Sequence, residues 1–169
     1  MQNPAMKAVV QRVSRGAVRV AGDTVGSIGP GMVVLLGVMT RDRAEDADRL
    51  AERTARLRVF ADGEGRMNRS LIDVGGEALV VSQFTLAGDT TRGHRPSFVT
   101  AAPPELAEAL YERYASSLAA QGVRVARGRF RAMMEVEILG DGPVTILLDE
   151  PRGSAGPEPG SGPGSGPAA

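Results

Sequence analysis

Met32–Val38 (MVVLLGV) is an unbroken run of apolar residues and the strongest structural signal in this sequence. It follows the turn Gly29-Pro30-Gly31 and consists mainly of aliphatic side chains, which predicts a central strand covered by protein on both faces. From Asp42 the apolar residues take a helical spacing, and Asp42 and Glu45 fit the N-cap and N3 positions of a helix. A buried strand followed by an amphipathic helix is a unit of layered α/β folds.

A second unit of the same kind follows further along the chain. Glu77–Ser82 (EALVVS) comes after the turn Gly75-Gly76 and predicts another buried strand. The pair Pro103-Pro104 opens a second helical pattern and Gly122 closes it, because proline favours the first turn of a helix and glycine its end. We therefore expect two main helices.

Shorter segments rich in β-branched residues flank these two units. At the amino end, Met6–Val13 and Gly16–Val20 predict a hairpin that turns at Ser14-Arg15-Gly16. At the carboxyl end three strands are predicted, over Val123–Arg131, Met134–Leu139 and Val144–Asp149. Residues 60–76 are loop-like. The order of two strands, two strand–helix units and three strands indicates a mixed α/β protein with a strand-rich layered fold.

The chain of 169 residues has the size of one domain. Residues 151–169 contain glycine, proline and serine but no large apolar side chain, so they are expected to form a disordered tail. Residues 1–150 are then the single folded domain, and residues 1–5 are a short extension of it.

Composition excludes several kinds of chemistry. The chain has no cysteine and one histidine, His94, which excludes disulfides, thiol nucleophiles and multi-histidine metal centres, and we expect no metal and no cofactor. Twenty basic residues balance twenty acidic ones, so no overall field attracts nucleic acid, and DNA is not an expected partner. No apolar run is long enough to span a membrane and no signal peptide precedes the domain, so the protein is expected to be cytoplasmic and independent of membranes.

Ser82-Gln83-Phe84-Thr85-Leu86 lies where the second buried strand ends, and residues 87–98 continue as a polar loop with glycine and proline. Functional residues gather at strand ends in α/β sheets. The same hydroxyl groups can also bond the local backbone as a strand closes, so composition alone leaves both interpretations open.

A Ser–His–acid triad would require His94 as its base. Ser82, Ser97 or Thr85 would be the nucleophile, and Asp89 or Asp141 would orient the histidine. The sequence has no Gly-x-Ser-x-Gly elbow, and His94 lies between two arginines that would disfavour its protonation. The residue pattern therefore argues against this triad.

Gly142-Pro143 interrupts two strand-like runs and must occupy a turn, an edge or a bulge. Because only about 5% of X-Pro bonds in folded proteins are cis, a trans turn is the default expectation, although the sequence does not decide the isomer. Arg127, Arg129 and Arg131 alternate, so on an extended strand they would form a basic stripe that either faces solvent or contacts the phosphates of a nucleic acid.

Four motifs together resemble the D-aminoacyl-tRNA deacylase family. They are the opening Met6–Val13 (MKAVVQRV), Ser82–Leu86 (SQFTL), Gly93–Phe98 (GHRPSF) and Gly142–Thr145 (GPVT), and their order and spacing match the family over residues 6–149. The resemblance implies a barrel-like sheet with two main helices packed on it. It also implies a homodimeric enzyme that hydrolyses the ester joining a D-amino acid to the 3′-terminal adenosine of tRNA, and that removes glycine mischarged on alanine tRNA.

The resemblance also implies roles for individual residues. The catalytic segment is Ser82, Gln83, Phe84 and Thr85, where backbone N–H groups stabilise the oxyanion, the 2′-hydroxyl of the RNA helps to activate water, and Thr85 either positions groups or acts as the nucleophile. The Gly142-Pro143 pair is cis in the family and enters the site of the other subunit, where its carbonyl groups select D-amino acids. By position, Arg12 would orient this pair, and Phe130 and Met134 would lie near the terminal adenine.

One departure and two alternatives accompany the resemblance. The family commonly has asparagine two positions before the motif glycine, where this chain has Gly140, so the support of that turn is in question. A related enzyme with a trans Gly-Pro bond would instead act on small L-aminoacyl-tRNA. A protein of another class would be a non-catalytic RNA-binding module that uses the arginine stripe.

Overall fold

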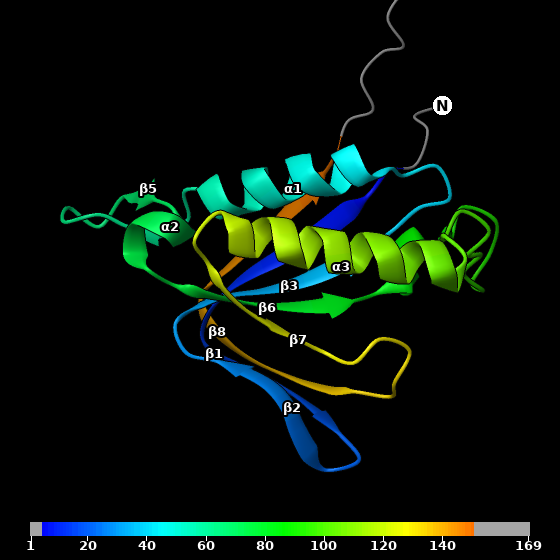
Figure 1. Ribbon diagram of the computed structural model, residues 1–169, viewed down its shortest axis with the longest axis horizontal. Helices are drawn as coiled ribbons and strands as arrows, with labels where there is room; N and C mark the ends of the chain where they lie inside the picture. Colours follow the sequence, from blue (N-terminus) through cyan, green and yellow to red (C-terminus); the bar gives the residue numbers. More distant parts are fainter. Residues whose placement is uncertain (1–4, 151–169) are drawn as a thin grey trace, which may run out of the picture.

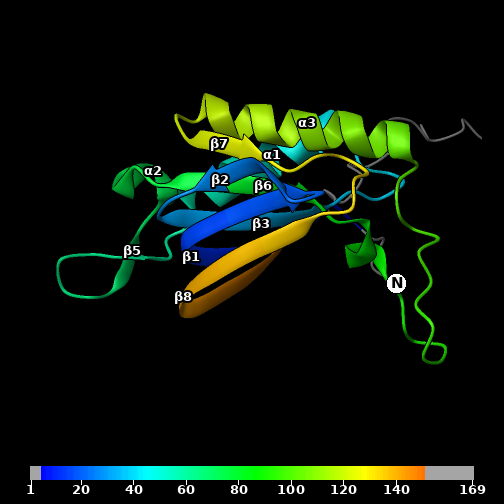
Figure 2. The ribbon, with the colours of Figure 1, turned by 90° about the horizontal axis from the view of Figure 1, so that it is seen from below.

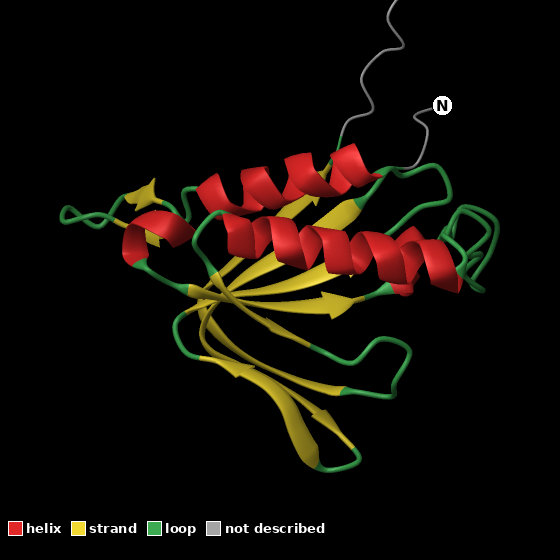
Figure 3. Cartoon of the chain, viewed as in Figure 1, coloured by secondary structure: helices red, strands yellow, loops and turns green. Residues whose placement is uncertain are grey.

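Two long helices lie side by side on one face of a strongly curved sheet (Figures 1 and 3). They are α1 (Ala44–Arg56) and α3 (Pro104–Ala120), the two main helices that the sequence predicts. This is a computed structural model that describes residues 5–150, so the expected tail at 151–169 and the first four residues of the expected extension lie outside the described part. The α/β class and the barrel-like sheet are confirmed.

Six strands build the sheet, and shorter elements connect them. The strands are β1 (Lys7–Val20), β2 (Asp23–Ile28), β3 (Gly31–Gly37), β6 (Glu77–Ser82), β7 (Arg124–Arg127) and β8 (Glu135–Asp149). The shorter elements are the hairpin β4 (Phe60–Ala61) and β5 (Met67–Arg69), the helix α2 (Leu71–Val74) and the 3₁₀ helix η1 (Phe84–Ala87). Residues 60–76, which the sequence suggested to be loop, therefore contain a hairpin and a helical turn.

Strand β1 is the central strand of the sheet and pairs with three other strands. Its one edge pairs antiparallel with β2 and then β3, and its other edge pairs with β8 along almost its full length. Beyond β3, strands β6 and β7 follow in parallel. The sheet curls until β2 approaches β7: a Cβ atom on Gly26 would lie only 2.5 Å from the Arg127 carbonyl oxygen, so only glycine fits this near closure of the barrel. Figure 2 shows this curl from below.

The central strands carry a separate core on each face, which explains their unbroken apolar sequence. Alternate side chains point to opposite faces of a strand. Met32 and Val34 belong to the core beneath α1 and α3, whereas Val33 packs with Leu79 and Val81 inside the curl. A polar residue on either face would be buried without a partner, so the sequence is apolar at every position.

The predicted hairpin at Ser14-Arg15-Gly16 is wrong, because β1 runs unbroken through these residues. Gly16 serves close packing instead: a Cβ atom there would lie 2.7 Å from a methyl group of Val33. The turn occurs at Ala21-Gly22, where both residues have positive φ, as a tight hairpin between twisted strands requires. The two predicted strands on either side of 140–143 are one strand, β8, and Gly142-Pro143 occupies a bulge in it, one of the three places that the sequence allowed, because the pairing with β1 shifts register there.

The predicted capping residues of the first helix are shifted by one position. Arg43 is the N-cap and Asp46 the N3 residue, whose side chain accepts a hydrogen bond from the Arg43 N–H. Asp42 is buried and accepts hydrogen bonds from the N–H groups of Met6 (3.0 Å) and Met39 (2.6 Å). Asp42 therefore ties the amino end of the domain to the β3–α1 connection.

Candidate active site

The segment from Ser82 to Thr85 leaves the sheet at the carboxyl end of β6. The N–H of Gln83 donates to the carbonyl oxygen of Leu36 on β3 (2.8 Å), which fixes the point where the chain turns away into η1. The Phe84 ring is 59% exposed and meets Phe98 edge to face, with 5.2 Å between ring centroids. The buried strand thus holds one end of the segment while its aromatic side chain faces outward.

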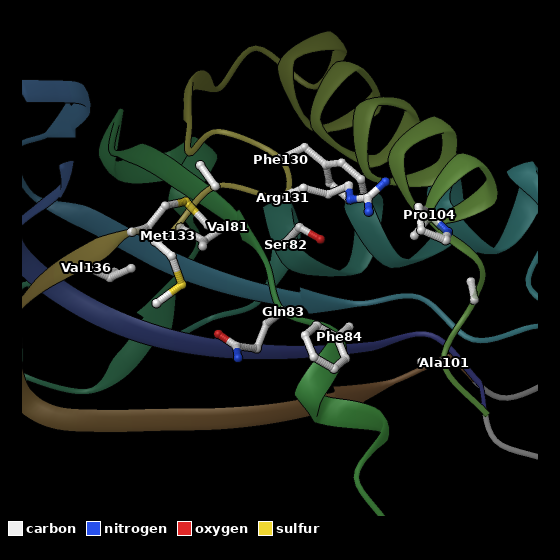
Figure 4. Close-up of a pocket in the computed structure, with 14 residues that line it drawn as sticks. Val81, Ser82, Gln83, Phe84, Ala101, Pro104, Phe130, Arg131, Met133 and Val136 are labelled. Atoms are coloured by element: carbon white, nitrogen blue, oxygen red, sulfur yellow. The ribbon is translucent and has the colours of Figure 1, made fainter. Parts of the chain in front are cut away.

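A pocket of about 570 Å³ opens beside this strand end (Figure 4). Ser82, Gln83 and Phe84 line it from β6 and η1. Phe130 and Met134 line it from the connection between β7 and β8, and the start of α3 contributes Pro104. Five of the nine residues that the resemblance singled out therefore lie around one cavity within a single chain.

The core fixes the two side chains of the β7–β8 connection. The Phe130 ring packs against Tyr111 of α3, with 6.1 Å between centroids, and the Tyr111 hydroxyl donates to the Val80 carbonyl oxygen (2.9 Å). Burial raises the pKa of Tyr111 to about 12, so it stays a neutral donor. Met134 lies so close to Gly128 that a Cβ atom on Gly128 would be 2.9 Å from the Met134 sulfur.

The Gly142–Pro143 segment lies elsewhere, on β8, and does not line this pocket. Its peptide bond is cis, as the resemblance implied and against the trans default. Arg12 contacts this bulge: its Nε donates to the Asp141 carbonyl oxygen (3.0 Å) and its guanidinium donates to the Val59 carbonyl oxygen (2.7 Å). The Arg12 side chain is 16% exposed and also pairs with the Asp141 carboxylate (3.3 Å). Arg12 therefore contacts the bulge through Asp141 in a chain that has glycine at position 140.

Thr85 is joined to Gln83, two residues earlier in the same segment. Gln83 Nε2 donates to the Thr85 hydroxyl, and Thr85 itself does not line the pocket. Asp89 accepts the N–H of Thr91 (2.9 Å), which holds the pKa of that carboxyl below its ordinary value. His94 is exposed, and within residues 5–150 no hydrogen bond joins it to a serine, threonine or aspartate. The Ser–His–acid triad is not assembled.

The predicted arginine stripe is wrong, because β7 ends at Arg127. Arg127 pairs with Glu112 of α3 (3.2 Å). Arg129 and Arg131 follow in the irregular connection, and Arg131 alone of the three lines the pocket. Arg131 was not predicted to be a pocket residue, although its place between Phe130 and Met134 in the sequence was a usable signal.

A model of the family described as "D-Tyr-tRNA(Tyr) deacylase" matches residues 9–149. The chain belongs to this family. Among its relatives, the D-aminoacyl-tRNA deacylase of Roseiflexus sp. (strain RS-1) is 59% identical over 87% of this chain and 98% of its own length. The corresponding protein of Symbiobacterium thermophilum is 58% identical over 87% of this chain and 97% of its own.

Solved structures of similar proteins share the deacylase family fold. The c-Myc DNA Unwinding Element Binding Protein is 40% identical, with a TM-score of 0.81 over 86% of this chain and 99% of its own. A structure described as a "probable eukaryotic D-amino acid tRNA deacylase" has a TM-score of 0.75 at 20% identity, which supports the fold alone.

Neither membrane spans nor metal sites are found in the described part of this deacylase-family chain. Across residues 5–150 no helix is long and apolar enough to cross a bilayer. Nor do three histidine, aspartate or glutamate side chains gather there as metal ligands. The pocket is lined mainly by apolar side chains, and its chemistry must come from few polar groups.

Proposed function

We propose that the protein hydrolyses the ester bond between a D-amino acid and the 3′-terminal adenosine of tRNA. Membership of the deacylase family makes it a hydrolase of aminoacyl-tRNA esters. The observation that carries the finer proposal is the pocket that joins Ser82, Gln83 and Phe84 to Phe130 and Met134. An apolar cavity with an aromatic ring suits a nucleobase, and the strand end beside it offers polar groups to the reacting carbonyl.

Catalysis in this pocket rests on positioning rather than on a side-chain base. Arg131 is the only charged residue among those that line the cavity, so no lining carboxylate or imidazole can take a proton. Water attacks the ester carbonyl, the backbone N–H groups of Phe84 and Thr85 stabilise the oxyanion, and the adenosine 2′-hydroxyl helps to activate the water. The bond to the ribose 3′-oxygen then breaks, and this oxygen takes up the proton that the water loses, which releases the amino acid and the tRNA. Thr85 keeps a positioning role.

Selection between mirror-image substrates falls to Gly142 and Pro143 of a second copy of the chain. Their carbonyl groups bind the substrate ammonium and leave no room for the side chain of an L-amino acid. This proposal draws support from the exposure of both residues and from their absence among the residues that line the pocket of their own chain. Glycine has no side chain to reject, so glycine mischarged on alanine tRNA is also removed. The enzyme is then a homodimer that works in the cytoplasm, and tRNA rather than DNA is its partner.

Hydrolysis of D-tyrosyl-tRNA and L-tyrosyl-tRNA by the purified protein tests this function. We expect the D-ester to react at least about 100-fold faster, because steric exclusion of the L side chain removes the productive geometry. Equal rates would refute chiral selection, and binding without hydrolysis would favour the RNA-binding module. Preferential hydrolysis of L-alanyl-tRNA would favour the related enzyme with a trans Gly-Pro bond, and inhibition by duplex DNA would count against tRNA as the sole nucleic-acid partner.

A further inference from the structure

Arg131 places an isolated positive charge at the mouth of the apolar pocket. It is exposed, and Figure 4 shows its side chain beside Phe130 over the cavity, on the side of α3. We propose that Arg131 binds the phosphate group on the 5′ side of the terminal adenosine while Phe130 holds the adenine. This inference rests on the proposed function and adds a binding residue to it.

The backbone explains how two consecutive side chains reach one cavity. On an extended strand, Phe130 and Arg131 would point to opposite faces. Arg131 instead has φ of +62°, a left-handed conformation that a residue other than glycine rarely adopts. The chain therefore turns at this position, and both side chains line the pocket. A rare backbone conformation at a cavity is the kind of feature that functional sites retain.

Within the described residues, Arg131 also has no ion-pair partner, unlike most arginines there. Ten arginines form ion pairs, at positions 12, 15, 19, 49, 53, 56, 66, 113, 124 and 127. Within residues 5–150 the Arg131 guanidinium makes no ion pair and no hydrogen bond. Its donors are free for a ligand of opposite charge.

A nucleotide is the ligand whose chemistry fits this pair. Its base is flat and apolar on both faces, as the surroundings of Phe130 require, and its phosphate is joined to it by a single ribose. A guanidinium group offers two parallel donors to phosphate oxygens, which fixes direction as well as charge. Arg131 would thus set how far the 3′ end of the tRNA enters the pocket.

The first test compares a substrate that carries the phosphate, aminoacyl-tRNA, with an adenosine ester that lacks both the phosphate and the rest of the tRNA. Arg131→Asn removes the charge and suits the left-handed backbone, since asparagine tolerates positive φ. We expect the KM for D-tyrosyl-tRNA to rise about 10-fold with little change in kcat, as for loss of a charged hydrogen bond. The log–log salt slope of KM should become shallower by about 0.7, the value for one single-strand phosphate contact. Hydrolysis of the D-tyrosyl ester of adenosine, which lacks the phosphate, should not change.

Binding of 5′-AMP and adenosine gives a second measurement that needs no catalysis. The unmodified protein should bind 5′-AMP more tightly, Arg131→Asn should abolish the difference, and Arg131→Lys should restore part of it. Arg66→Asn, in the exposed hairpin at the other end of the molecule, is the matched control and should change nothing. Equal losses on both esters, or an unchanged preference for 5′-AMP, would overturn the role of Arg131. If the unmodified protein hydrolyses neither D-ester but Arg131 still sets the 5′-AMP preference, the proposed function fails while the phosphate site stands.

Discussion

The two parts of the candidate site are built in different ways. The pocket at the end of β6 is complete within one chain, because the sheet and α3 hold Ser82 and Phe130 from opposite sides. The Gly142–Pro143 segment is exposed on β8, and the side chain of Arg12 donates a hydrogen bond to the neighbouring Asp141 carbonyl oxygen. The hydrophobic core fixes the first part, whereas the second lies exposed on the surface of the chain.

The setting of β8 supports a second copy as the partner of this segment. One edge of β8 pairs with β1, and within residues 5–150 its other edge pairs with no strand. Leu139 and Leu147 are 50% and 72% exposed on the same strand. A long edge strand with exposed leucines is open to association, which a homodimer would satisfy.

The largest effect on activity is expected at Gly142, in the exposed segment. Gly142 has φ of +124°, and a Cβ atom there would lie 3.1 Å from Arg12 and from the Val144 nitrogen. Gly142→Ala should therefore displace the segment and lower kcat/KM for D-tyrosyl-tRNA by about 100-fold, the usual result of misplacing a positioning group by about 1 Å. Adenosine binding in the pocket should not change.

Gly140→Ala is the matched control, since a Cβ atom at Gly140 meets nothing within 4 Å. Mixing Gly142→Ala protomers with Phe130→Ala protomers shows which chain supplies the segment. If it enters the partner's pocket, one site in each mixed dimer has both changes and the other has neither, so about one quarter of all sites regain full activity in a twofold dimer. No gain on mixing would mean that each pocket uses its own segment.

A smaller effect is expected at Phe130, in the pocket. Phe130→Ala removes the ring proposed to hold the adenine, and loss of one base stack of about 1–3 kcal/mol should raise KM about 10-fold. The ratio of D to L hydrolysis should stay the same, because the proposed arrangement gives Phe130 the adenine and Gly142-Pro143 the amino acid. Phe130→Tyr, which keeps the ring, should retain most of the affinity. A changed D/L ratio would show that the two parts are not independent.

The sequence predicted the pocket side of the site better than the segment side for a physical reason. Met32–Val38 and Glu77–Ser82 must be apolar on both faces, so their strands, and the polar residues that follow them, were readable from pattern alone. The path of β1 and β8 was not, because glycine signals both turns and close packing, and Gly16 and Gly140 do not form turns. The backbone turn that brings Arg131 beside Phe130 has no pattern of its own, since arginine rarely adopts positive φ.

The smallest effect is expected at an ion pair between α1 and α3, whose two residues belong to neither part of the site. Arg113 of α3 donates two hydrogen bonds of 2.7 Å to the Asp48 carboxylate of α1, which lowers the pKa of Asp48 to about 2. Because the folded pKa lies below the unfolded value, this stabilisation is present above about pH 4 and is lost as pH falls through about 2. Both side chains are more than a third exposed, so Asp48→Asn should lower the free energy of unfolding by only about 0.5–1 kcal/mol at pH 7.

Urea unfolding at several pH values should show that the difference in the free energy of unfolding between Asp48→Asn and the unmodified protein shrinks below about pH 4. Hydrolysis of D-tyrosyl-tRNA should stay unchanged. Glu52→Gln, which breaks the more exposed pair with Arg56, is the control and should cost less. A loss of activity in Asp48→Asn without a loss of stability would mean that the helices help to shape the pocket beyond holding Phe130 in place.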